Sequence, residues 1–346
     1  MAEAVQTRMP DAAARHAGAL PTPRARRRYV IVLSILIVLS IVFAFGLLAW
    51  DNPMPVGSDG FWRIAQLRVT NVTVIAVVAV AQAVATVAFQ TVTNNRIITP
   101  SIMGFESLYR VVQTGSVYLF GVTGLIAIQG LWQFGLQIVI MVALAMLLYG
   151  WLLTGRYANL QIMLLVGIII GGGLGAIATF MQRLLTPSEF DVLAARLFGN
   201  VSNADADYLP LAIPLCVAAA ALLWMRSWRL NVMALGADTA NSLGVNHRRE
   251  LLITLFLVAV LMATSTALVG PMTFLGFLVA TLAYQFADTY DHRLVFPVAV
   301  LTAFTILTGA YFVMRHIFSA QGVVSILIEF VGGVVFLIVI LRKGRL

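Results

Sequence analysis

The side chains of this sequence that could do chemistry are few and scattered. The four histidines, His16, His247, His292 and His316, stand far apart, and Cys216 is the single cysteine. A catalytic metal is usually held by His, Cys, Asp or Glu at short fixed spacings such as HExxH, and the sequence contains no such pattern. It also lacks the phosphate-binding pattern GxxxxGK[ST]. We therefore expect no catalytic residue, no metal and no cofactor, and any ATP hydrolysis to belong to another subunit.

Acidic side chains within apolar segments are the remaining candidates. Glu106 and Glu329 lie in such segments, and a charge inside a membrane is costly and usually kept for function. Glu106 stands four residues before Arg110, a spacing that predicts pairing along one helix face. Glu329 has no partner in its own segment. We predict that Glu329 forms an interhelical hydrogen bond or lies at the mouth of a transport path. The alternative is that it is an ion-coupling acid.

The composition of the chain defines the elements that must position these residues. Hydrophobic residues make up 61% of the 346 and charged ones 10%, and the mean hydropathy is +0.95. A soluble domain could not bury so much apolar surface. The apolar runs are continuous, without the alternation of barrel strands, so they predict helices. We predict an all-α membrane protein: a disordered cytoplasmic tail, residues 1–28, then one polytopic transmembrane permease domain, residues 29–346.

Ten apolar runs are long enough to cross a membrane, at about 20 residues per crossing. The predicted spans are 29–49, 69–90, 106–122, 128–153, 160–183, 207–225, 250–269, 273–287, 294–314 and 322–341. Ten crossings return the chain to its starting side, and the loops on that side hold most of the arginines. The positive-inside rule makes that side the cytoplasm, with both termini in it. The net charge of +8 is then explained by arginines that lie near membrane lipid on the cytoplasmic side. We therefore expect no nucleic-acid partner.

Two features of the loops suggest how such a domain works. PSIMGF, residues 100–105, follows the second span, and GPMTFLGF, residues 270–277, follows the seventh on the opposite side. Broken segments at matching positions predict an inverted repeat of five-helix units around a transport path, with chance similarity as the alternative. The inner stretch 227–249 mixes apolar and polar residues, with glycines at 236 and 244. It predicts a short helix on the cytoplasmic surface.

Several motifs in order carry a family resemblance. MALGADTANSLGV, residues 233–245, resembles the cytoplasmic loop of FecCD-type permeases, which import iron siderophores, haem and vitamin B12. TSTALVGPMTFLGFLV, residues 264–279, DHRLVFPVAVL, residues 291–301, and the C-terminal residues 322–343 are similar to further motifs of that family. The resemblance covers essentially the whole chain after the tail.

The sequence departs from the family pattern at some positions, and one segment resembles a particular branch of the family. Ala280 and Thr281 replace the family's Pro-His, and Gly309 stands where an aspartate is usual. NNRIITPSIMGFESLY, residues 94–109, resembles the branch that serves iron chelates. The resemblance therefore implies an iron–siderophore substrate, with haem or vitamin B12 as alternatives.

The family likeness implies a complex at the cell (cytoplasmic) membrane. It would contain two ABC ATPase subunits, a second permease that is homologous or identical, and an extracytoplasmic substrate-binding protein. The glycine-hinged loop would dock onto an ATPase groove, since short helices presenting an apolar face suit such a groove. The matching positions are Leu235, Gly236, Ala240, Leu243 and Gly244.

Two further residue sets follow from the predicted topology. Arg63, Arg68 and Arg315 lie on the outer side, where we expect them to meet acidic residues of the binding protein, with lipid contact as the alternative. The fifth span is small and weakly polar, which predicts a translocation path, with helix packing as the alternative for its glycines. The path candidates are Gln161, Gly171, Gly172, Gly173, Thr179 and Gln182. No iron ligand is expected, because the metal travels inside its chelator.

Two rival functions stay open at this point. An ion-coupled secondary transporter would use Glu106 or Glu329 as its coupling acid. A non-transporting membrane scaffold would not need the glycine-hinged amphipathic loop, so the loop argues against it. Replacing Gly236 and Gly244 with bulky residues separates the first rival from an ATP-driven importer.

Overall fold

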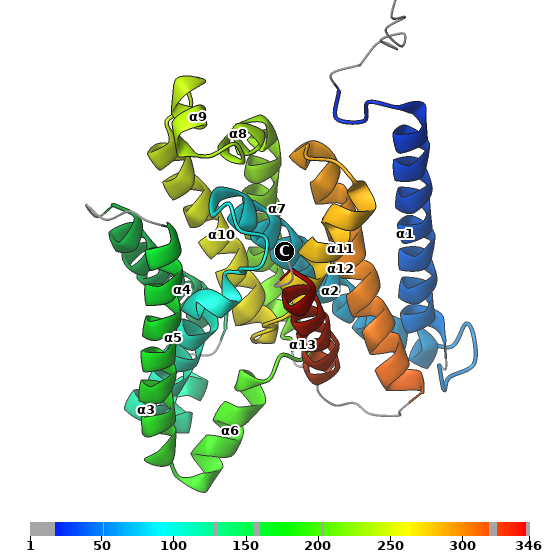
Figure 1. Cartoon of the computed structure of the whole chain (residues 1–346). Coiled ribbons are helices and arrows are strands. Elements are labelled where there is room, and N and C mark those ends of the chain that lie inside the picture. Colours follow the sequence, from blue (N-terminus) through cyan, green and yellow to red (C-terminus); the bar gives the residue numbers. More distant parts are fainter. Residues whose placement is uncertain are drawn as a thin grey trace, which may run out of the picture.

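A computed structural model of the chain describes residues 18–50, 52–127, 130–154, 160–201, 204–317 and 324–343 (Figure 1). The regular elements in these ranges are helices. The bounds of the long helices are α1 Pro23–Ala49, α2 Asp59–Val92, α3 Glu106–Ala127, α4 Leu131–Thr154, α5 Leu160–Arg183, α7 Leu209–Met225, α10 His247–Val269, α11 Leu275–Ala287, α12 His292–His316 and α13 Val324–Lys343. The short elements are η1 Ser101–Phe105, α6 Pro187–Leu197, η3 Ala206–Tyr208, α8 Ser227–Met233 and α9 Ala237–Ser242. The all-helical class is confirmed.

The beginning of α1 differs from the sequence prediction. Residues 1–17 of the predicted disordered tail lie outside the described residues, but the tail does not extend to residue 28, because α1 begins at Pro23. The side chain of Thr22 accepts a hydrogen bond from the Ala25 backbone N–H at 3.1 Å, and proline at the first helical position has no N–H to lose. These local caps start the helix before its apolar run.

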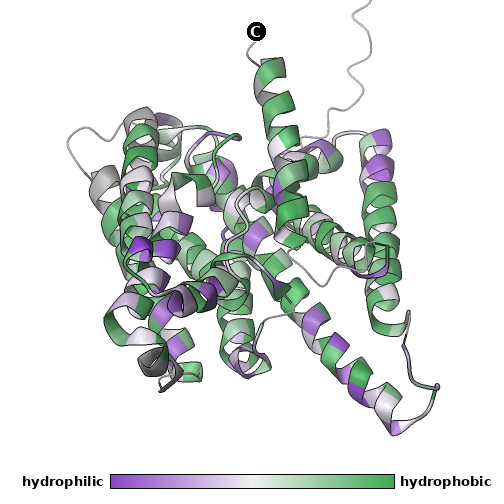
Figure 2. Cartoon of the chain, turned by 90° about the horizontal axis from the view of Figure 1, so that it is seen from below, coloured by the Kyte–Doolittle hydropathy of each residue, from purple (hydrophilic) through white to green (hydrophobic). Residues whose placement is uncertain are grey.

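Each of the ten predicted spans overlaps a described helix. Within the described residues, seven helices are long and apolar enough to cross a membrane: α1, α2, α4, α5, α7, α10 and α12. The apolar helices α11 and Val324–Ile338 of α13 are shorter. Most residues of the helices are hydrophobic (Figure 2), and many large hydrophobic side chains are exposed in the single chain. Ten crossings and cytoplasmic termini therefore stay a prediction.

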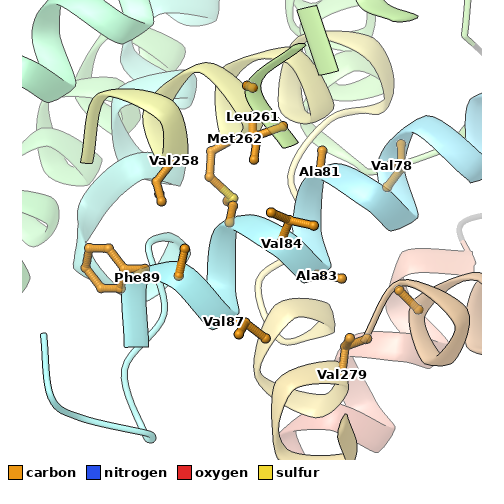
Figure 3. Packing of buried hydrophobic residues seen from close by; sticks show 14 of the residues in the cluster. Val78, Ala81, Ala83, Val84, Val87, Phe89, Val258, Leu261, Met262 and Val279 are labelled. Carbon is orange, nitrogen blue, oxygen red and sulfur yellow. The ribbon is translucent and has the colours of Figure 1, made fainter. Parts of the chain in front are cut away.

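The centre of the fold is the long helix α2 packed against α10. In each of these two helices 78% of the most apolar stretch is buried, against 17% in α1 and in α5. Val84 and Phe89 of α2 face Val258 and Met262 of α10 (Figure 3). Helix α2 also contacts α1, α7, α8, α11 and α12. Helix α2 thus connects six other helices at the centre of the domain.

The segments that connect the long helices lie at two opposite ends of the molecule. Helices α8 and α9 lie at one end, together with the start of α1 and the α11–α12 connection, while α6 and the α1–α2 connection lie at the other (Figure 1). At the first end, Arg28 Nη1 bonds Asp288 Oδ2 at 2.8 Å and Arg28 Nη2 donates to the Gln285 carbonyl at 3.2 Å. The start of α1 is therefore attached to the turn between α11 and α12.

Candidate coupling loop and translocation path

The stretch between α7 and α10 folds into two short helices, α8 and α9, where sequence predicted one. The chain bends between them at Gly236, which has φ 95° and ψ 167°. Helix α9 ends in a Schellman motif at Gly244, which has φ 80°. There the Val245 N–H donates to the Ala240 carbonyl at 2.9 Å and the Gly244 N–H to the Asn241 carbonyl at 3.0 Å. Both glycines occupy backbone conformations that other residues rarely adopt.

The loop has an inner and an outer apolar face. Ala240 is fully buried and Met233 is 1% exposed, so these residues pack inward. Leu235 and Leu243, in contrast, are 59% and 57% exposed. Of the predicted coupling residues, the two leucines therefore offer an outer surface, Ala240 supports it, and the glycines shape it.

Ion pairs hold this loop to the helix that follows it. Glu250, in the first turn of α10, is 5% exposed and accepts a hydrogen bond from Arg229 Nη1 at 2.5 Å. Its second oxygen pairs with Arg226, which precedes α8. Because one buried carboxylate binds both arginines, the start of α8 is attached to the start of α10. The sequence analysis did not predict this role of Glu250. The available signal was an acidic residue at one end of the loop and two arginines, Arg226 and Arg229, at the other.

The three consecutive glycines of α5, Gly171, Gly172 and Gly173, differ in whether another part of the chain packs against them. A Cβ on Gly171 would lie 2.9 Å from the Cα of Gly104 in η1, which is closer than real Cβ contacts allow. Gly171 is therefore a packing residue. A Cβ on Gly172 or Gly173 would have no other described atom within 4 Å, and both residues are exposed. These two glycines leave one face of α5 small and uncovered in the single chain.

The polar path candidates on α5 also differ in their surroundings. Gln182 Nε2 donates to Thr114 Oγ1 of α3 at 3.1 Å, so it connects two helices. Thr179 is exposed, and its hydroxyl donates to the Gly175 carbonyl in its own helix at 2.9 Å. The side chain of Gln161 lies outside the described residues. Thr179 is therefore exposed, like Gly172 and Gly173, whereas Gln182 makes a contact between α5 and α3.

The two broken segments of the predicted repeat meet each other. The first holds η1, with Gly104 at φ 99°, and the second runs from Gly270, at φ 87°, to the start of α11. Thr273 Oγ1 of the second segment donates to Glu106 Oε2, which follows the first, at 2.5 Å. In the described part of the chain Glu106 and Arg110 form no salt bridge, so the predicted close pair is absent, although the two charges still interact electrostatically. Glu106 is 7% exposed while Arg110 is exposed, and the nearby Thr273 gives the buried acid a closer donor.

Glu329 joins the same cluster from α13. Its carboxylate lies near Thr273 and interacts electrostatically with Arg110 and Glu106. Glu329 is half-buried. The neighbour that its own segment did not reveal therefore comes from the second broken segment, and the interhelical hydrogen bond of Glu329 stays a prediction.

The three predicted docking arginines are not equivalent. Arg63 and Arg68 lie within α2, and not in a loop, because Ser58 caps that helix by accepting a hydrogen bond from the Phe61 N–H at 3.2 Å. Arg68 is 4% exposed and donates to the carbonyls of Leu48 and Trp50 at 3.1 and 2.8 Å. This contact closes the C-terminal end of α1. Arg63 and, at the end of α12, Arg315 are exposed.

Long apolar helices with an apolar loop presented at one end define a polytopic membrane protein, the class to which permeases belong. The chain belongs to the FecCD transport family, whose sequence model matches residues 25–342. The resemblance predicted from the motifs is confirmed.

Individual relatives agree with this assignment. The chain is 52% identical to the petrobactin import system permease protein FatC of Bacillus anthracis, over 96% of this chain and 94% of the relative. It is 25% identical to the petrobactin import system permease protein FatD of the same organism, over 92% of both chains. Among solved structures, an inward-facing metal-chelate type ABC transporter has a TM-score of 0.76 at 21% identity, covering 91% of this chain and 99% of that one. At that identity the structural likeness shows the fold alone.

Proposed function

We propose that this chain is the permease subunit of an ATP-driven importer for an iron–siderophore chelate of the petrobactin class. The observation that carries the proposal is the surface formed by Leu235 and Leu243, two exposed leucines on a glycine-shaped loop beyond the long helices. Such a surface suits the groove of a separate ATPase subunit, since an apolar helical face is usually covered by a partner. The substrate class rests on the name of the 52% identical relative.

The proposed topology has ten crossings with both termini and the coupling loop in the cytoplasm. Its support is the charge of one end of the molecule. The start of α1, the coupling loop and the α11–α12 connection share that end (Figure 1). These segments hold Arg24, Arg26, Arg27, Arg28, Arg226, Arg229, Arg248, Arg249 and Arg293. An arginine-rich end favours the cytoplasmic side.

The proposed translocation path lies against α5 and the cluster of Glu106, Arg110 and Glu329. Arg110 is exposed in the single chain, and a charged side chain facing lipid within the membrane is costly. This face therefore suits contact with a second permease and a watery path. Thr179, Gly172 and Gly173 are the proposed lining on α5, with Gln161 and Gln182 at its two ends and Gly171 behind them.

The second permease is proposed to be a homologue. The relatives FatC and FatD are both named as permeases of a petrobactin import system in one organism, and this chain is much more similar to the first. The extracytoplasmic binding protein is proposed to dock at the opposite end of the molecule, where Arg63 and Arg315 are exposed. The buried Arg68 supports that end from within.

The test uses the complex co-purified with its ATPase and second permease and placed in vesicles with the binding protein. We expect uptake of ferric petrobactin to require ATP and to continue when ionophores remove proton and sodium gradients. Leu235→Asp and Leu243→Asp should abolish ATPase association, while Leu67→Asp, an exposed leucine on α2, should not. Uptake that follows an ion gradient and ignores ATP would refute the proposal and favour coupling through Glu106 or Glu329. ATP-dependent uptake of haem or vitamin B12 in preference would refute the substrate class.

A further inference from the structure

A chain of polar contacts, buried at its inner end, joins the coupling loop to the centre of the domain. Asn231 of α8 accepts two hydrogen bonds at Oδ1: from the backbone N–H of His292 at 3.0 Å and from its ring Nδ1 at 2.5 Å. The other ring nitrogen, Nε2, lies 2.6 Å from the hydroxyl of Thr91 in the last turn of α2. The amide nitrogen of Asn231 donates to Asp291 Oδ1 at 3.0 Å. Three helices, α8, α12 and α2, thus meet at one histidine.

The directions of these hydrogen bonds are fixed by what each atom can do. Asp291 is a carboxylate acceptor, so the Asn231 NH₂ group must face it and the amide oxygen must face His292. An amide oxygen only accepts, so His292 carries a proton on Nδ1. The neutral ring then presents Nε2 as an acceptor to the Thr91 hydroxyl, whose single proton is shared with the Val87 carbonyl at 2.9 Å. Asp291 also caps α12 by accepting from the Arg293 N–H at 3.0 Å, which holds its carboxylate in place.

The inner part of the cluster is buried, which makes it a rigid connection. His292 is 3% and Thr91 6% exposed, so water does not compete for the contact between them, whereas Asn231 and Asp291 at the outer end of the cluster are partly exposed. Asn231 lies four residues before Leu235, on the loop that offers the docking surface. Thr91 lies in the last turn of α2, which packs against six other helices. A displacement of the loop is therefore passed to α2 and α12 through polar contacts of defined length.

We propose that Asn231 and His292 are positioning residues that transmit movement of the coupling loop to α2 and α12. This inference rests on the proposed function, because it assigns a path to coupling between ATP hydrolysis and transport. The ion pairs of Glu250 hold the loop to α10, whereas the His292 cluster holds it to the two other helices. Breaking the cluster leaves the docking leucines in place and removes the connection behind them.

The test exchanges the two partners of one hydrogen bond. Asn231→Asp sets a second carboxylate against Asp291, so repulsion opens the cluster. Adding Asp291→Asn restores a donor and an acceptor at these two positions, keeps the acceptor for His292, and leaves a good helix cap. Asn246→Asp is the matched control, since Asn246 caps α10 in the same loop by accepting from the Arg249 N–H at 3.0 Å and aspartate caps equally well.

The measurement is the number of chelates imported per ATP hydrolysed, in vesicles holding complexes of equal subunit content and equal unfolding temperature. We expect Asn231→Asp to lower that ratio on the order of tenfold, and the double exchange to restore it to within about twofold, the behaviour of residues coupled in one network. A single variant with the wild-type ratio, or a double exchange no better than the single one, would overturn the inference. Wild-type vesicles without ATP-driven uptake would instead refute the proposed function itself.

Discussion

The two glycines of the coupling loop predict opposite responses to the same substitution. A Cβ on either residue would have no described atom within 4 Å, so crowding plays no part and only the backbone conformation matters. Gly244 occupies the C′ position of a Schellman motif, a left-handed position that asparagine also accepts. Gly236, at φ 95° and ψ 167°, lies in a region that is almost restricted to glycine. Asparagine should therefore be tolerated at 244 and rejected at 236.

The magnitudes follow from these conformations. Strain of about 1–3 kcal/mol is expected for a side chain at Gly236, and about 1–2 kcal/mol for alanine at Gly244. Each 1.4 kcal/mol of strain shifts the equilibrium constant between the docking conformation and other loop conformations tenfold towards the others. The apparent affinity for the ATPase falls with the fraction of permeases that leave the docking conformation. These strains set upper limits for the loss of binding of about 100-fold for Gly236→Asn and about 30-fold for Gly244→Ala, and we expect a loss of less than about twofold for Gly244→Asn.

Binding of the purified ATPase subunit to the permease complex in nanodiscs measures this directly. Gly172→Ala is the control, because it adds a methyl group at an open position within a regular helix. The unfolding temperature of each variant shows whether the domain itself is intact. Equal losses for asparagine at both positions, or tolerance at Gly236 alone, would refute the reasoning from backbone conformation.

Three further predictions test other parts of the structure. Arg68→Ala should cost about 1–3 kcal/mol, seen as a lower unfolding temperature, because two carbonyls lose their donor, whereas Arg63→Ala should leave that temperature unchanged and weaken binding-protein affinity. Gly171→Ala should destabilise the domain by about 1–3 kcal/mol through contact with a facing backbone, while Gly172→Ala should not; thermal unfolding of both variants measures this. Hydrogen bonds from the Thr186 backbone and hydroxyl lower the pKa of Glu189 in α6, so their stabilisation is present above about pH 4.3 and is lost as the pH falls through the lowered value. Hydrogen exchange of α6 should accelerate over that range, and Glu189→Gln should remove the pH dependence.

Much of the fold was predictable because hydropathy acts over single segments. Every predicted span overlaps a helix, and the glycines at 236 and 244 were recognised as hinges. The helix starts were less predictable, since caps such as Thr22 and Ser58 begin a helix several residues before its apolar run. For the same reason Arg63 and Arg68 were expected in a loop and lie in α2.

The partners of polar residues were the least predictable part. Glu106 was matched with Arg110 on its own helix, but its donor is Thr273, 167 residues away in sequence. His292 was one of four scattered histidines, and its partner Asn231 lies 61 residues earlier. Spacing within one helix cannot reveal contacts that only the packing of several helices creates. The run Asp291–His292–Arg293 before an apolar span was a signal for the helix cap alone.

The attachments of the coupling loop determine what kind of docking is expected. A Schellman motif, the Glu250 ion pairs and the His292 cluster hold the loop in shape within the single chain. Since the docking leucines are already placed, binding of an ATPase need not order the loop and loses less conformational entropy. A loop held in this way passes on the movement of its partner, whereas a loose one would absorb it. Variants of the attachments should therefore separate docking from coupling: the ATPase stays bound, and its hydrolysis no longer drives transport.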